Sequence, residues 1–150
     1  MNDECKTMKT PVKYIDIHHD IGWYHGTWEK NIESIRKDGF KIQFDNSSQY
    51  TSGVYLLDHA SHPRIRNFGN VIIQAYVNGR FIDATSEYDW DQFYRQYAKI
   101  SDPKAQYDAI RRDYPRADGV KIGIGEHGNM LVVWNTDVVR YYGIHEKREI

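Results

Sequence analysis

The sequence holds little of what several classes of protein require. Its single cysteine, Cys5, excludes a disulfide within the chain and a cysteine-based structural zinc site. No apolar run approaches the roughly 18 residues that a membrane helix needs. The first residues also lack the basic and then apolar pattern of a secretory signal. We therefore expect a protein that works in the cytoplasm and has no membrane partner.

Several catalytic and binding motifs are also missing. No G-x-G-x-x-G follows a predicted strand and no G-x-x-x-x-G-K-[ST] occurs, which argues against a doubly wound nucleotide-binding fold. Ser52 lies in no G-x-S-x-G turn. His59-x-x-His62 beside Asp58 is more typical of a solvated loop than of a metal site, so we expect no metal. The formal net charge of -1 argues against a nucleic-acid binder driven by bulk electrostatics, although a local basic patch stays possible.

Aromatic residues are the first positive signal. They make up 14% of the chain, and 12 of them are tyrosines. Because tyrosine joins an apolar ring to a polar hydroxyl, this composition favours core edges and the walls of a ligand cleft. The length of 150 residues suits one ordinary domain. We expect a single domain over residues 1–150, with a flexible tail at residues 1–11.

Apolar alternation predicts several short strands. Asn78-Gly79 separates two of them and is typical of a hairpin turn. Helical and extended segments follow one another in an order that favours an α+β domain with a mostly antiparallel sheet. The expected strands are residues 13–17, 22–25, 54–57, 71–77, 80–84, 120–124, 131–134 and 138–142.

Helical spacing appears in three other stretches. Thr27 can cap a helix over residues 28–37, which Gly39 then ends. Residues 60–67 predict a short helix. Residues 86–114 carry an aromatic stripe and a second run at helical spacing, and so predict a helical insert between strands.

Two runs of residues carry a resemblance to a known family. Residues 24–27 read Tyr-His-Gly-Thr before a helix, and residues 51–57 read Thr-Ser-Gly-Val-Tyr-Leu-Leu after a polar loop. These runs resemble the diphtheria-toxin/PARP-like branch of the ADP-ribosyltransferase superfamily. With the later Glu126-His127-Gly128, the chain is also similar to small phage-encoded anti-CRISPR ADP-ribosyltransferases. The resemblance implies a split antiparallel sheet that binds NAD in the cleft between its halves.

The same resemblance implies roles for individual residues. His25 would hydrogen-bond the adenosine ribose, and Gly26 would receive the nicotinamide against its backbone, where a Cβ would crowd a flat ring. Thr27 would place a hydroxyl near a ribose, and Ser52 would also contact NAD. Tyr55 would stack on the nicotinamide as its bond to ribose lengthens. The alternative for His25 and Tyr55 is a purely structural role.

The third element of the family pattern is a late glutamate, and here the chain departs from it. Met130 stands ahead of the strand where the glutamate is expected. Three readings stay open. Glu126 acts from across the turn, which we favour; a carboxylate of the insert, such as Glu87 or Asp89, reaches in; or the site lacks the acid and only binds.

The implied activity is mono-ADP-ribosylation, in which the enzyme cleaves NAD at the nicotinamide bond and transfers ADP-ribose to a macromolecule. The insert would read the target, which we expect to be a host protein, with a nucleic acid not excluded. A phage or bacterial effector or toxin would act in this way. Two alternatives remain, a catalytically silent NAD- or partner-binding module of the same fold and an RNA 2′-phosphotransferase-like enzyme.

Overall fold

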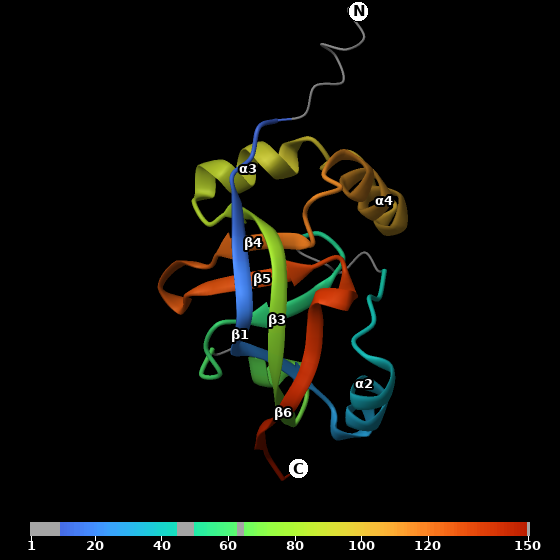
Figure 1. Cartoon of the computed structure of the whole chain (residues 1–150), viewed down its shortest axis with the longest axis vertical. Coiled ribbons are helices and arrows are strands. Elements are labelled where there is room, and N and C mark those ends of the chain that lie inside the picture. Colours follow the sequence, from blue (N-terminus) through green and yellow to red (C-terminus); the bar gives the residue numbers. More distant parts are fainter. Residues whose placement is uncertain (1–9, 45–49, 63–64, 150) are drawn as a thin grey trace, which may run out of the picture.

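Five strands close on one another into a barrel-like sheet, and a sixth extends one side of it (Figure 1). The computed structural model describes residues 10–44, 50–62 and 65–149. Hydrogen bonds connect the strands in the order β1-β2-β5-β4-β3, and β3 pairs with β1 to close the ring, while β6 adds to β3. The strands are β1 (Tyr14–Thr27), β2 (Val54–Leu57), β3 (Val71–Ala84), β4 (Gly119–Gly123), β5 (Asn129–Val133) and β6 (Val139–Lys147).

The helices surround this sheet, and the α+β prediction is confirmed. Figure 1 shows α3 and α4 together at the top, beyond β4, and α2 at the lower right beside β6. The predicted short helix at residues 60–67 is a 3-10 turn that begins later. The helical elements are η1 (Glu29–Asn31), α2 (Ile32–Asp38), η2 (Ile65–Phe68), α3 (Glu87–Arg95), α4 (Pro103–Asp113), η3 (Gly125–His127) and η4 (Thr136–Val138).

The predicted hairpin at Asn78-Gly79 is wrong, because β3 continues through it as one strand of 14 residues. Its odd-numbered core residues, from Val71 to Phe81, face one core cluster, and the even-numbered Ile72, Ile82 and Ala84 face the other. This alternation continues across positions 78 and 79 without a slip, as in an uninterrupted strand. Gly79 serves close packing instead of a turn, since a Cβ there would lie 2.8 Å from Asp118 Oδ2.

Strand β1 is one continuous strand that joins the two strands predicted at residues 13–17 and 22–25, and the register irregularity between them lies within it. Its pairing with β3 shifts register between Ile17 and Asp20 and again between Asp20 and Trp23. His19, within the first shift, has a φ of 48° and donates its backbone N–H to Asn78 Oδ1. The break expected at residues 18–20 is therefore a bulge within one strand.

The helical insert is the crossover between two parallel strands. β3 and β4 pair in parallel, from Phe81 opposite Gly119 to Ala84 opposite Ile122, whereas the other strand pairs are antiparallel. Parallel neighbours need a connection of about a dozen residues or more, usually helical, and α3 and α4 provide it. Ser86 caps α3 by accepting the Asp89 N–H at 3.0 Å.

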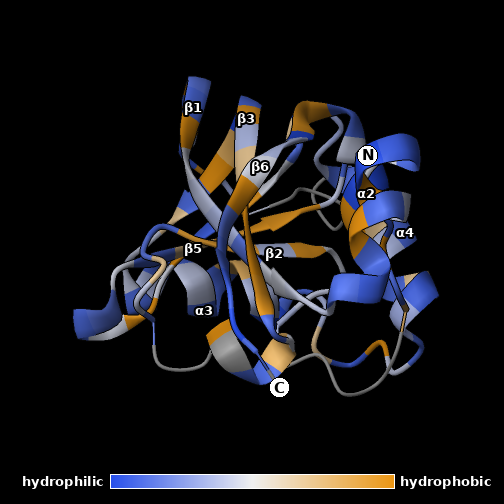
Figure 2. Ribbon diagram, turned by 90° about the horizontal axis from the view of Figure 1, so that it is seen from below, coloured by the Kyte–Doolittle hydropathy of each residue, from blue (hydrophilic) through white to orange (hydrophobic). Residues whose placement is uncertain are grey.

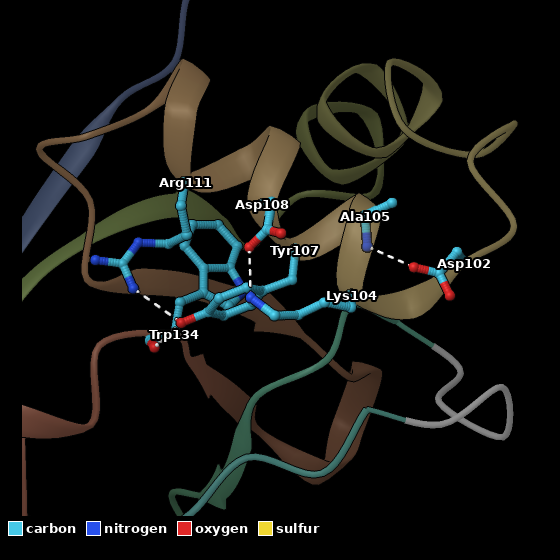
Figure 3. A network of polar contacts seen from close by, with 7 residues as sticks. All are labelled: Asp102, Lys104, Ala105, Tyr107, Asp108, Arg111 and Trp134. Atoms are coloured by element: carbon cyan, nitrogen blue, oxygen red, sulfur yellow. Dashed lines mark hydrogen bonds and ion pairs between the residues drawn. The ribbon is translucent and has the colours of Figure 1, made fainter.

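A polar network attaches α4 to the end of β5 (Figure 3). The Tyr107 hydroxyl donates to the Trp134 carbonyl at 2.8 Å and accepts from Arg111 Nη1 at 3.1 Å. At the start of the helix, Asp102 accepts the Ala105 N–H at 2.8 Å, and Lys104 pairs with Asp108 along the surface. α4 therefore begins at a capped turn, and Tyr107 attaches it to the end of β5 in addition to its apolar core contacts.

Two hydrophobic clusters fill the opposite faces of the sheet, and Figure 2 shows hydrophobic residues running along the strands. One cluster packs under α3 and α4 and includes Phe93, Ile110 and Trp134. The other lies on the opposite face, where Ile32 and Ile35 reach it. Of the predicted tail, residues 1–9 fall outside the described part, which leaves Cys5 undescribed.

The last residues of that tail are attached to the crossover. Thr10 donates its N–H to Gln96 Oε1 at 3.2 Å, and its carbonyl accepts the Tyr114 hydroxyl at 2.9 Å. Within the described ranges, no helix is long and apolar enough to cross a membrane.

Candidate functional site

A cleft of about 1370 Å³ opens over the sheet face that packs under α3. Ligand pockets usually hold about 300–1,000 Å³, so this cleft has room for a dinucleotide. Tyr55, Leu57, Ile122 and Met130 line it from three neighbouring strands. The remaining lining includes the end of β1, α2 with the segment after it, the residues before β2, η2, the start of α3 and the segment between β4 and β5.

His25 lies in the cleft at the end of β1, and its ring is fixed on two sides. Nδ1 donates to the Tyr55 carbonyl at 2.9 Å, and the Phe40 ring meets it edge-on, with 5.3 Å between centroids. Burial lowers the pKa of His25, and the bond to the Tyr55 carbonyl opposes this only in part. The ring is therefore neutral near pH 7, with its proton on Nδ1 because a carbonyl can only accept. Nε2 is left as an acceptor for a ligand hydroxyl.

Gly26 and Thr27 follow in the cleft wall, and both have structural partners. A Cβ on Gly26 would lie 2.2 Å from the Ile65 carbonyl oxygen, so the close approach of η2 already requires glycine here. The Thr27 hydroxyl accepts from Asn31 Nδ2 at 3.2 Å. The prediction that Thr27 caps the helix is wrong, since the capping positions are Trp28 and Asn31, and neither makes a side-chain cap bond. Gly39 does end α2, with a φ of 85°.

Tyr55 lines the floor beside two other aromatic rings. Its hydroxyl donates to the Thr51 carbonyl at 2.7 Å, which holds the ring in place. The Tyr50 ring lies 6.4 Å from it and meets Trp90 of α3 edge-on at 5.4 Å. Ser52 is only 2% exposed and is not among the cleft-lining residues.

The sequence patterns missed Tyr50 and Trp90 as site residues. The aromatic stripe at residues 90–97 predicted a helical insert, and Phe93 and Tyr97 are buried in it. Trp90 stands one turn earlier on α3 and is only half-buried, so it lines the cleft as well. The sequence signal that could have identified Trp90 as a site residue is its position in the first turn of a helix that follows a strand.

The carboxylates are placed differently from the favoured expectation. Glu126 is exposed in η3 and does not line the cleft, although its neighbours Gly125 and His127 do. Met130 is 6% exposed and forms part of the floor. Of the described residues that line the cleft, Glu87 alone carries a carboxylate and Lys41 alone an ammonium group.

The histidines near the cleft form no metal centre in the described part of the chain, where no group of three potential metal ligands occurs. His62 and His127 meet edge-on at 5.1 Å. His59 Nε2 lies 3.6 Å from Asp58 Oδ1, while that carboxylate also accepts the Asn129 N–H at 3.0 Å. Asp58 thus anchors the start of β5 beside the cleft.

No protein-family model matches this chain, and no curated protein matches it significantly. The described residues of the cleft offer a neutral imidazole acceptor at His25, one carboxylate, one ammonium group and five other aromatic rings, those of Phe40, Tyr50, Tyr55, Phe68 and Trp90. This set suits a ligand with sugar hydroxyls, planar rings and a charged centre.

Proposed function

We propose that the protein is a mono-ADP-ribosyltransferase that binds NAD in this cleft, cleaves its nicotinamide glycosidic bond and transfers ADP-ribose to a macromolecule. One observation carries the proposal. His25, Gly26 and Thr27 on β1 and Tyr55 on β2 line the same cleft, and they are four of the six residues that the family resemblance joins in one NAD site. A hydrogen bond of 2.9 Å connects His25 Nδ1 directly to the Tyr55 backbone.

The closed sheet with its helical crossover is then a variant of the split-sheet fold of that superfamily. In this reading His25 Nε2 accepts a hydrogen bond from a ribose hydroxyl. Tyr55 provides a flat apolar surface for the nicotinamide, and Lys41 a positive charge for the pyrophosphate. The side chains have the chemistry that NAD requires.

The reaction depends on position more than on proton transfer. When the bond between the ribose C1′ and the nicotinamide nitrogen breaks, the electron pair goes to the ring nitrogen, and nicotinamide leaves as a neutral molecule. The ribose C1′ becomes electron-poor and takes a nucleophile from the target. Residues that fix the ribose and the nicotinamide supply much of the rate by holding both in reacting geometry.

The partner we propose is a host protein in the cytoplasm, with the protein acting as an anti-defence effector or toxin. A catalytically silent NAD-binding module is the second candidate. Met130 at the expected acid position and Glu126 outside the cleft favour it. An RNA 2′-phosphotransferase has less support, because Lys41 is the one cation that the described residues bring into the cleft.

The test is nicotinamide release from NAD by the purified protein, with and without host-cell lysate, together with transfer of labelled ADP-ribose to lysate macromolecules. His25→Ala should abolish release and labelling. His18→Ala is the matched control, since His18 is an exposed histidine of the same strand that does not line the cleft. Tight NAD binding without release would identify the silent module, and no binding at millimolar NAD would refute both.

A further inference from the structure

We propose that Glu87, in the first turn of α3, is the catalytic carboxylate of this cleft. The inference rests on the proposed NAD cleavage and adds the residue that stabilises the reacting charge. Its starting point is the composition of the lining, where Glu87 is the only carboxylate among the described residues. Glu87 belongs to the helical crossover, outside the strands that bear His25 and Tyr55.

The backbone that carries Glu87 is held firmly at the cleft. Ser86 accepts the Asp89 N–H through its hydroxyl and the Trp90 N–H through its carbonyl, both at 3.0 Å. Just before them, the Thr85 hydroxyl donates to Asp83 Oδ1 at 2.8 Å. The first turn of α3 is therefore capped and tied to the end of β3.

Strand β4, the parallel neighbour of β3, also contacts the backbone just before this turn. A Cβ on Gly123 of β4 would lie 2.2 Å from the Thr85 carbonyl oxygen, so the two backbones are in close contact there. Trp90, one turn after Glu87, meets the Tyr50 ring across the cleft wall at 5.4 Å. Glu87 thus has a flexible side chain on a backbone that is fixed on three sides.

The charge of Glu87 is available to a ligand. Within the described ranges no ion-pair partner lies near it, whereas Asp91 on the same helix pairs with Arg95 at 2.6 Å. Asp58 contacts Asn129 with both oxygens, and Glu126 is not among the lining residues. Among the described carboxylates near the cleft, Glu87 is the one that lines it and has no ion-pair partner in the described ranges.

The proposed reaction gains from a negative charge beside the reacting carbon. As the C1′–N bond breaks, its electron pair moves to the nicotinamide nitrogen and positive charge spreads over C1′ and the ring oxygen of the ribose. A carboxylate beside this charge stabilises the transition state more than the ground state. The acceptor then forms a bond to C1′, and the proton it loses passes to the Glu87 carboxylate and on to water. In the absence of a target, water is the acceptor and the products are ADP-ribose, nicotinamide and a proton.

The experiment compares Glu87→Gln, Glu87→Asp and Glu126→Gln in steady-state nicotinamide release, with Asp91→Asn as an exposed control on the same helix. Loss of one such electrostatic group lowers kcat by about 100- to 1,000-fold in other enzymes. We expect a fall of that size in Glu87→Gln with the KM for NAD changed less than about threefold, and partial activity in Glu87→Asp. Asp91→Asn should match the unmodified protein. Because Glu87 is exposed, the variants should keep the wild-type melting temperature and circular dichroism.

Several outcomes would overturn the assignment. Full activity of Glu87→Gln, or a loss confined to Glu126→Gln, would remove Glu87 from the reaction while the proposed function stands. A rise in KM at unchanged kcat would make Glu87 a binding residue instead. If the unmodified protein itself releases no nicotinamide, the proposed function fails and this inference fails with it.

Discussion

Gly26→Ala tests whether the glycine in the cleft wall serves the fold or the ligand. A Cβ at this position would lie 2.2 Å from the Ile65 carbonyl oxygen and 3.2 Å from Phe68 Cβ. Ordinary contacts begin at about 3.4 Å, so the backbone of η2 must move by about 1 Å. A backbone atom cannot yield by changing rotamer, which places the cost in the upper part of the overpacking range of about 1–3 kcal/mol.

Part of that cost is offset, because alanine restricts the unfolded chain and gains about 0.4–1 kcal/mol relative to glycine. The net loss should be about 1–2 kcal/mol in the free energy of unfolding. For a chain of this length, that lowers the melting temperature by about 2–8 °C. Urea denaturation and a thermal melt, both without ligand, measure it.

Gly143→Ala is the matched control. Gly143 lies in β6, and a Cβ there would have no atom within 4 Å. This variant should be unchanged or slightly more stable. If Gly26→Ala also keeps its full stability and loses only ligand binding, the steric argument is refuted, and the glycine serves the ligand alone.

The remaining predictions concern buried polar groups. Thr51→Val removes the acceptor of the buried Trp134 indole N–H, which lies 3.0 Å from the Thr51 hydroxyl. Urea denaturation should show a free energy of unfolding lower by about 1–3 kcal/mol. A loss of less than about 0.5 kcal/mol would contradict this prediction. Burial lowers the pKa of His25. The unfolded chain therefore binds that proton more readily, and stability should fall as pH drops through about 6.5. His25→Asn should flatten this slope between pH 5 and 7 by up to about 1.4 kcal/mol per pH unit, and an unchanged slope would place His25 in water. Tyr97→Phe removes the hydroxyl that donates to Asp113 at 2.8 Å and should lower the free energy of unfolding by about 1.5–3 kcal/mol. Melting curves equal to those of the unmodified protein would contradict this prediction.

Local signals in the sequence were enough to predict the crossover helices. A change to helical spacing over residues 86–114 marks them, and both helices form within that range. β2 appears at residues 54–57 as predicted, because a short apolar run between turn formers has few alternatives.

The long strands were not predictable in this way. Asn78-Gly79 is a strong hairpin signal by itself, but β1, β4 and β6 together pair with β3 over residues 71–77 and 79–84 and hold it extended. The gain from these three neighbours exceeds the local preference for a turn. Gly79 is needed for the approach of Asp118, a reason that only the fold reveals.

The family resemblance grouped His25, Gly26, Thr27 and Tyr55 in one candidate site, whereas their spacing in the sequence did not. The pairing of β1 with β2, with Tyr24 opposite Leu57, brings these four residues to one cleft. Whether Glu126 or Glu87 faces the same space depends on the course of η3 and on the packing of α3 against β4. Neither follows from sequence spacing.

The most direct test of the account is a calorimetric titration of the protein with a non-cleavable NAD analogue. We expect one binding site per chain. His25→Ala should reduce the affinity for the analogue at least about tenfold, because a ribose hydrogen bond is lost, and His18→Ala should leave it unchanged. No heat of binding at millimolar analogue, or equal binding by His25→Ala, would contradict the claim that this cleft is an NAD site.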